Sequence, residues 1–149
     1  MDISQITGYL YIASRIKDDD LDAILNLDPS LIISMIVERR PPKALTDANL
    51  NVLWLRTFDF VLIPIPLRTL RRGVEAALPV VGEGGRVLVF CAGGRHRSVA
   101  MASCILIGQG YSADEAMRLI SSRRNVADPY AWHIKRQIRR FEAFWRAIV

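Results

Sequence analysis

Three short apolar runs constrain the fold of this chain most strongly. They are Leu31–Val37, Asn51–Leu55 and Arg86–Phe90. Each run has the length of a strand and lacks polar alternation, which is typical of strands covered on both faces. Segments of helical length lie between and after these runs. The sequence therefore predicts an α/β fold in which a mainly parallel central sheet is flanked by helices on both faces.

Capping residues mark the ends of the expected helices. Pro66 can take the first position of a helix that runs through Val81. Gly110 is expected to close a mostly apolar helix over Val99–Gln109, and Ser112 opens a capping box for the next helix. Asp128, followed by proline, is expected to open the last helix.

The first third of the chain gives weaker signals. Ile6–Ser14 is expected to be a strand pair or an extended segment, and the acidic run Asp18–Asp20 to begin a helix that ends near Leu27. The charged stretch Glu38–Lys43 is expected to be a surface loop.

Composition limits the class of protein. A chain of 149 residues with 51% hydrophobic side chains suits one folded domain, and its net charge of +5 favours anionic partners. Two cysteines cannot form a disulfide framework, which favours a reducing compartment such as the cytoplasm. Neither a secretion signal nor a stretch long enough to span a bilayer is visible in the sequence.

The segment that joins the third apolar run to the next helix has the composition of an anion-binding loop. A tight loop at a helix N-terminus turns backbone N–H groups inward, next to the positive end of the helix dipole. Gly93 and Gly94 are expected to allow that turn, and Arg97 can present a forked guanidinium to two phosphate oxygens. The predicted phosphate loop consists of Ala92, Gly93, Gly94, Arg95, His96 and Arg97.

Cys91 begins this loop, where a positive field would favour the thiolate over the thiol. The thiolate is the nucleophile, so no partner base would be needed. The spacing between Cys91 and Arg97 is a weak signal alone. The strand, the two glycines, the following serine and the helix around it are the parts that such chemistry requires. A buried core cysteine at a strand end is the alternative interpretation.

This pattern resembles the cysteine-based protein tyrosine phosphatases, whose loop is Cys-x5-Arg followed by Ser or Thr, and most closely their small dual-specificity branch. The resemblance extends over nearly all of residues 1–149, including the opening Ile6–Ser14 and a closing helix with Gln137 and Phe141. It implies one phosphatase domain, a cysteinyl-phosphate intermediate and no metal or other cofactor. It also implies that Ser98 stabilises the departing thiolate in the second step.

A phosphatase of this kind needs a proton donor for the leaving group, on a loop near the phosphate. Asp59 follows a predicted strand and precedes Cys91 by a separation similar to that in the dual-specificity branch. The same carboxylate would then activate water in the second step. Asp47 and Asp128 are weaker candidates, because they are expected in a variable loop and at a helix cap. A turn-forming surface aspartate is the alternative interpretation of Asp59.

The chain departs from the family pattern at Phe90, and the rim of its loop carries two additional cationic or titratable side chains. Phe90 stands where the family usually has a histidine that helps to hold the thiolate, so we expect Cys91 to be less reactive than in its relatives. Arg95 and His96 are expected on the exposed rim, where they would suit a strongly anionic substrate. A metal site is not expected, because the other histidine, His133, lies in the basic final helix.

The final helix is the one strongly basic segment. Its apolar residues follow helical spacing, which predicts a stripe facing the core and a solvated basic face rather than a nucleic-acid or membrane surface. Cys104, in the apolar helix after the loop, is expected in the core.

The sequence thus predicts a cytoplasmic phosphatase that uses Cys91, Arg97, Asp59 and Ser98 on phosphotyrosine, and on phosphoserine or phosphothreonine, in proteins. One alternative is a phosphatase for a polyanionic non-protein substrate, a phosphoinositide or an RNA 5′-phosphate. Another is a phosphate-binding module with little turnover, and a third is a sulfur transferase of the rhodanese type. Nucleic acid is otherwise not expected as a partner.

Overall fold

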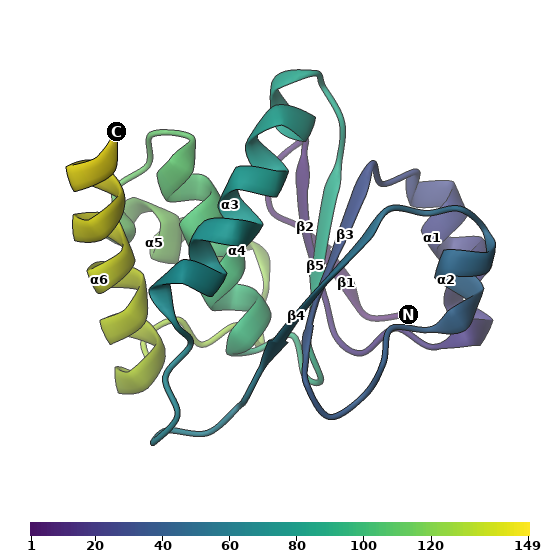
Figure 1. Ribbon diagram of the computed structural model, residues 1–149, viewed down its shortest axis with the longest axis horizontal. Coiled ribbons are helices and arrows are strands. Elements are labelled where there is room, and N and C mark those ends of the chain that lie inside the picture. Colours follow the sequence, from purple (N-terminus) through teal and green to yellow (C-terminus); the bar gives the residue numbers. More distant parts are fainter.

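A five-stranded sheet runs through the middle of the molecule (Figure 1). The structure is a computed structural model that describes residues 1–149, and its strands lie in the order β1-β2-β5-β3-β4. β1 is antiparallel to β2, and all other neighbouring strands are parallel. The strands are β1 (Ile3–Gln5), β2 (Leu10–Ala13), β3 (Leu31–Ile36), β4 (Val52–Thr57) and β5 (Val87–Phe90).

Helices cover both faces of this sheet, as the sequence predicts. α1 and α2 lie on one side in Figure 1, and α3, α4, α5 and α6 lie on the other. The helices are α1 (Leu21–Leu27), α2 (Lys43–Asp47), α3 (Leu67–Gly82), α4 (Arg97–Gly108), α5 (Ala113–Arg123) and α6 (Trp132–Ile148). The predicted α/β architecture with a mainly parallel sheet is therefore confirmed.

The strands in the centre of the sheet are apolar because both of their faces are covered. Every residue of β2, β3 and β5 is buried. α4 packs on these three strands and is itself covered by α3, α5 and α6, so it is buried from Arg97 through Ile107. This double coverage explains why the helix is apolar on all sides and has no hydrophilic face.

Several predicted element ends are confirmed. Glu115 donates its backbone N–H to Ser112 Oγ at 3.1 Å, and Ser112 donates its own to Glu115 Oε1 at 2.8 Å, which forms the expected capping box. Gly110 has a φ of +106° after α4, in the region that favours glycine. The predicted extended segment at Ile6–Ser14 contains β2, which pairs with β1.

Other predicted ends are wrong. α4 begins at Arg97 rather than at Val99, and Pro66 precedes α3 as its cap residue. α6 begins at Trp132, so Asp128 does not cap it and its carboxylate contacts the phosphate loop instead. The predicted surface loop after β3 leads into the short helix α2, which the sequence did not indicate.

The apolar stripe predicted for the final helix and the core position predicted for Cys104 are confirmed. α6 buries an apolar stripe through Ile134, Ile138 and Phe141 against the core, with Gln137 beside it. Cys104 is completely buried, and burial raises the pKa of its thiol well above the ordinary value. None of the helices combines the length and the apolarity needed to cross a membrane.

The parallel strands bring several loops to one edge of the sheet. The carboxyl ends of β2, β3, β4 and β5 point the same way, so the loops that follow them are neighbours. In open α/β sheets this edge is where ligands bind. The next sections of chain after these strands carry Arg15, Glu38, Asp59 and Cys91.

Candidate active site

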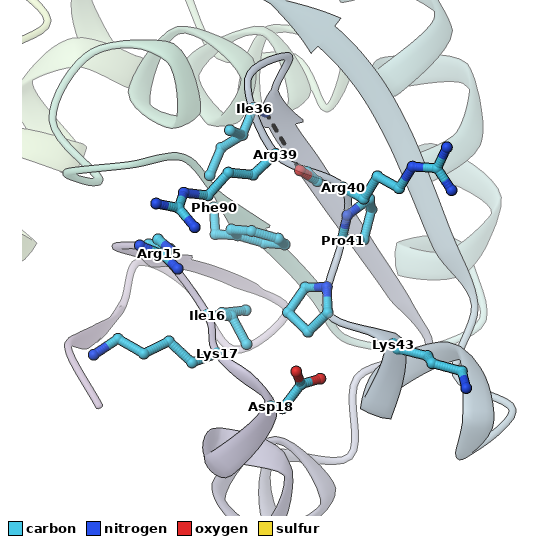
Figure 2. Close-up of a pocket in the computed structure, with 12 residues that line it drawn as sticks. Arg15, Ile16, Lys17, Asp18, Ile36, Arg39, Arg40, Pro41, Lys43 and Phe90 are labelled. Carbon is cyan, nitrogen blue, oxygen red and sulfur yellow. Dashed lines mark hydrogen bonds between the residues drawn. The ribbon is translucent and has the colours of Figure 1, made fainter.

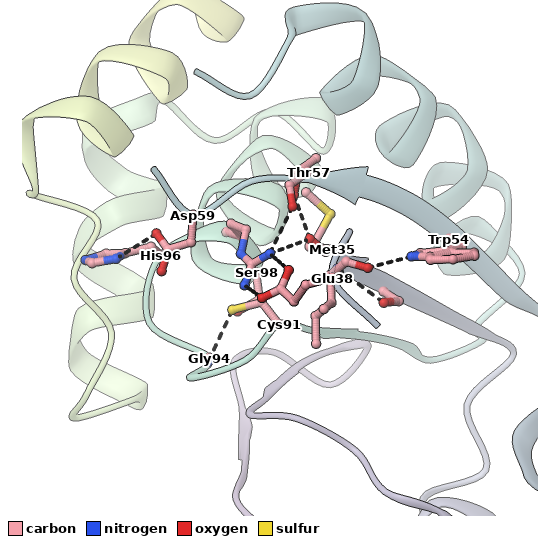
Figure 3. A network of polar contacts seen from close by, with 12 residues as sticks. Met35, Glu38, Trp54, Thr57, Asp59, Cys91, Gly94, His96 and Ser98 are labelled. Atoms are coloured by element: carbon pink, nitrogen blue, oxygen red, sulfur yellow. Dashed lines mark hydrogen bonds and ion pairs between the residues drawn. The ribbon is translucent and has the colours of Figure 1, made fainter. Parts of the chain in front are cut away.

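Cys91 directly follows β5 and lies at the bottom of the phosphate loop. Its side chain is only 3% exposed. The backbone N–H of Gly94 donates to Cys91 Sγ at 3.2 Å, and Ser98 Oγ lies 3.1 Å from the same sulfur (Figure 3). Two hydrogen-bonding groups thus face the sulfur, and both can donate to a thiolate.

Several backbone N–H groups of the phosphate loop are unpaired. The N–H groups of Ala92, Gly93, Arg95 and His96 donate no hydrogen bond to a protein acceptor. α4 begins at the end of this loop, and no side chain caps its first turn. Free N–H groups at a helix N-terminus form a site for an anion. The loop therefore has the form that the sequence predicts for phosphate binding.

Arg97 is 2% exposed and is held by groups from two neighbouring strands and their loops. Its Nη1 and Nη2 donate to Glu38 Oε1 and Oε2 at 2.9 and 3.1 Å. Nη1 also lies within hydrogen-bonding distance of the carbonyls of Thr57, at 2.9 Å, and Met35, at 3.2 Å. The hydrogen bond from Arg97 lowers the pKa of Glu38, which keeps this carboxylate charged.

These contacts leave one edge of the Arg97 guanidinium free. Nε is buried and has no hydrogen-bond partner. Nη2 carries two hydrogens and makes one bond, to Glu38. Since buried donors are nearly always paired, Nε and Nη2 form an edge that lacks its acceptor. A phosphate in the loop would accept from this edge.

A second buried arginine supports the loop from behind. Arg124, at the end of α5, is 1% exposed, and its Nε donates to Gly94 O at 2.7 Å. Its Nη1 and Nη2 donate to the two carboxylate oxygens of Asp2 at 3.0 and 2.6 Å, and Nη1 also donates to Ser4 Oγ. Arg124 thus ties the phosphate loop to the first strand.

Only one of the two loop glycines is required by its conformation. Gly94 has a φ of +62°, and a Cβ there would lie 2.8 Å from Ala13 O. Gly93 has no positive φ, and a Cβ would meet nothing closer than Arg95 Cβ at 3.9 Å. The bending role predicted for Gly93 is therefore wrong, and that for Gly94 agrees with the structure.

Asp59 lies in the loop after β4 and reaches the phosphate loop. Its Oδ1 is 3.4 Å from His96 Nδ1, and Figure 3 shows the two side chains facing each other. On the opposite side of the ring, Asp128 Oδ2 lies 3.6 Å from His96 Nε2 and also 3.6 Å from Arg95 Nη2. Carboxylates therefore face both rim side chains, Arg95 and His96, and His96 is only 21% exposed rather than fully on the surface.

His133 also joins this group. Its ring lies 5.3 Å from the His96 ring, centroid to centroid, in an edge-to-face arrangement. The sequence argument against a metal site assumed that the two histidines are apart, and that assumption is wrong. Asp59, His96 and His133 each offer a ligand atom, and these atoms lie within 4.8 Å of one another.

A basic cavity of about 390 Å³ adjoins the phosphate loop (Figure 2). Phe90 lies in its wall, and Arg15 connects it to the loop by donating its backbone N–H to Ala92 O at 3.0 Å. The cationic residues that line the cavity are Arg15, Lys17, Arg39, Arg40 and Lys43. Phe90, where the family pattern has histidine, thus packs beneath a cationic surface.

Sequence reasoning missed three residues of the site. Glu38 lies in a charged stretch that resembles any surface loop, and Arg124 follows a helix with no motif around it. His133 lies in a helix whose periodicity indicates only packing. Each contacts the phosphate loop or its arginine across a long sequence separation, so no local pattern could have identified it.

Known proteins resemble this chain in part of the sequence and in the fold. No protein-family model matches the chain. Dual specificity phosphatase 28 of Mus musculus is 42% identical over 57 residues, which span 38% of this chain and about a third (33%) of the mouse protein.

Solved structures show the same fold over nearly the full chain. The human dual specificity phosphatase DUSP28 superposes with a TM-score of 0.83 at 21% identity, over 98% of this chain and 96% of that one. PTPMT1 in complex with PI(5)P gives a TM-score of 0.85 at 23% identity, over 98% and 97% of the two chains. At these identities the likeness shows the fold.

The two glycines of the loop provide a matched pair of variants. We expect Gly94→Ala to lower the free energy of unfolding by about 1–3 kcal/mol, because it forces a side chain into a left-handed conformation against Ala13 O. We expect Gly93→Ala to change it by less than about 0.5 kcal/mol, because its Cβ enters open space. Urea unfolding measures both variants, and equal losses would contradict this account of the loop.

The ion pair behind the loop predicts a pH-dependent contribution to stability. The hydrogen bonds from Arg124 lower the pKa of Asp2. A carboxylate with a lowered folded pKa stabilises the fold above its unfolded pKa of about 3.9, and this contribution is lost as the pH falls through the folded pKa. Asp2 is half exposed, so we expect Asp2→Asn to cost about 1–2 kcal/mol at pH 7.

Urea unfolding of wild type and Asp2→Asn at pH 7 and at pH 3 measures this contribution. The difference between the two proteins is expected to shrink at pH 3. A difference of the same size at both pH values would show that the Asp2 carboxylate does not carry the effect.

Proposed function

We propose that the chain is a member of the cysteine-based protein tyrosine phosphatase superfamily, in its small dual-specificity branch, and that it hydrolyses phosphate monoesters through a cysteinyl-phosphate intermediate on Cys91. One observation carries the proposal. Cys91 Sγ lies against the donors of Gly94 and Ser98 at the bottom of a loop whose other N–H groups are free, with the unpaired edge of Arg97 beside it.

In the first step the Cys91 thiolate attacks phosphorus in line with the leaving oxygen. The S–P bond forms while the P–O bond to the leaving group breaks, and Asp59 donates a proton to the departing oxygen. The free N–H groups of the loop and the Nε and Nη2 groups of Arg97 stabilise the charge on the three equatorial oxygens.

In the second step water attacks the cysteinyl phosphate. The Asp59 carboxylate takes a proton from the water, the S–P bond breaks, and inorganic phosphate and the thiolate are released. The Ser98 hydroxyl, 3.1 Å from the sulfur, donates to the departing thiolate and makes it a better leaving group. All these roles belong to side chains and backbone groups of the chain, so the proposed mechanism needs no metal ion. The two free cysteines suit the reducing cytoplasm as its setting.

We infer that phosphorylated protein is the first candidate substrate, and the loop that carries Asp59 supports this inference. Phe58 and Phe60 flank Asp59 and are half exposed, and Val61, Leu62 and Ile63 continue the exposed apolar surface. An exposed apolar surface beside a reacting group favours contact with a peptide and with the ring of phosphotyrosine.

A polyanionic non-protein substrate is the second candidate, and the basic cavity favours it. Five cationic side chains line this cavity and Arg15 hydrogen-bonds to the phosphate loop through its backbone, whereas Arg95 and His96 face the carboxylates of Asp59 and Asp128. The fold is shared with PTPMT1, which has been crystallised with PI(5)P. A phosphoinositide headgroup or an RNA 5′-phosphate end would place additional negative charge in this cavity.

Hydrolysis of a phosphotyrosine peptide, of PI(5)P in micelles and of a 5′-phosphorylated RNA separates the two candidates. The proposal predicts the highest kcat/KM on the peptide. It also predicts that the cavity variant Arg39→Glu/Arg40→Glu changes kcat/KM on the peptide by less than threefold. The charge-matched control is Arg136→Glu/Arg140→Glu on α6. If kcat/KM is highest on PI(5)P or RNA, and falls tenfold or more in the cavity variant but not in the control, the polyanionic substrate replaces phosphoprotein as the proposed substrate.

The proton-donor role of Asp59 has its own test. A good leaving group needs little protonation, so we expect Asp59→Asn to lower kcat/KM by about 10²-fold on phenyl phosphate and by far less on p-nitrophenyl phosphate. Asp47→Asn, an exposed carboxylate on α2, serves as the control and should change neither value. Cys91→Ser should abolish turnover of both substrates. Equal losses on the two substrates for Asp59→Asn would contradict the assignment.

A further inference from the structure

The mouth of the candidate active site holds a second group of reactive side chains, from three separate segments. Asp59 comes from the loop after β4, His96 from the phosphate loop and His133 from the first turn of α6. One ligand atom from each lies within 4.8 Å of the others. We propose that these three side chains bind a zinc ion, and that zinc bound there reversibly inhibits the enzyme.

The donor set is the one that zinc takes in sites with an open position. Two imidazole nitrogens and one carboxylate oxygen would occupy three corners of a tetrahedron, with water at the fourth. Ligand atoms around zinc lie roughly 3.4 Å apart when each bond is about 2.0–2.1 Å. Asp59 Oδ1 and His96 Nδ1 already lie 3.4 Å apart. Only His133 has to approach, and its side chain at the start of α6 is partly exposed.

Asp128 offers a hydrogen-bond acceptor behind His96, as metal-bound histidines usually have. When Nδ1 of His96 binds a metal, its proton must sit on Nε2. That nitrogen is buried without a hydrogen-bond partner, and the Asp128 carboxylate lies 3.6 Å from it. A carboxylate behind a ligating histidine fixes the ring and strengthens the metal bond. The carboxylates of Asp59 and Asp128 also offset the positive charge of the ion and of nearby Arg95.

Zinc at this position would block the chemistry through Asp59. A carboxylate that ligates zinc can neither donate a proton to the leaving group nor accept one from water. The inhibition therefore rests on the proposed function, whereas the binding of zinc does not. Magnesium prefers sites made of oxygen ligands and should bind far more weakly.

Calorimetric titration of the Cys91→Ser protein with zinc chloride tests the binding, since this variant removes the other strong zinc ligand. We expect one zinc ion to bind per chain, and no binding of magnesium over the same range of metal concentrations. His133→Gln in the Cys91→Ser background should weaken zinc binding at least tenfold, and Asp128→Asn about tenfold. Asp22→Asn, on α1 across the sheet, is the control and should leave it unchanged.

Absence of zinc binding in Cys91→Ser would overturn the proposal. So would His133→Gln and Asp128→Asn proteins that bind zinc as tightly as Cys91→Ser does. The latter result would mean that the carboxylates beside His96 are ion-pair partners alone.

Turnover of phenyl phosphate, the substrate that depends on proton donation by Asp59, by the otherwise wild-type protein tests the inhibition. Zinc should inhibit, an excess of EDTA should restore activity, and His133→Gln should raise the half-inhibitory zinc concentration by the same factor as it weakens binding. Equal inhibition of wild type and His133→Gln would overturn the proposal in favour of zinc at Cys91. Zinc that binds at His133 without slowing turnover would overturn the inhibition, and with it the role of Asp59 in the proposed function.

Discussion

A single buried guanidinium connects the packing of the sheet to the candidate chemistry. Arg97 lies at the first turn of α4 and is bound by Glu38 and by the carbonyls of Met35 and Thr57, which belong to the segments around β3 and β4. A buried charge is costly unless it is paired, so these segments must keep their places for the fold to accommodate Arg97. Its free edge then faces the phosphate loop. The same side chain therefore connects α4 to β3, to β4 and to the loop after β3, and offers the donors that a phosphate needs.

The sequence predicted the parts of the fold and site that have local signatures. The three apolar strands, the capping box at Ser112 and the loop with Cys91 and Arg97 are all recognisable from neighbouring residues, and the structure contains each of them. The expectation that Asn51–Leu55 is a buried strand is wrong, because β4 lies at the edge of the sheet and is only partly buried. Glu38, Arg124 and His133 could not be found in this way. Their contacts depend on how distant segments meet at the edge of the sheet. The cap predicted at Asp128 failed for the same reason, because the side chain serves a tertiary contact instead.

The surroundings of Cys91 divide into two chemically different sides. The loop after β4 supplies Asp59 and exposed apolar side chains, next to His96 and His133. The loops after β2 and β3 line a cavity with five cationic side chains. The first side suits a phosphotyrosine in a peptide. The second side suits a substrate that carries additional negative charge. The balance between these two sides determines which substrate the loop serves, while the bond-making groups in the loop stay the same.

The central claim is that Cys91 accepts the phosphoryl group. Acid quenching during turnover of p-nitrophenyl phosphate, followed by peptide mass spectrometry, tests it most directly. The account predicts a phosphoryl group on the peptide that contains Cys91, and none in Cys91→Ser. A phosphoryl group on His96, or turnover that persists in Cys91→Ser, would contradict it.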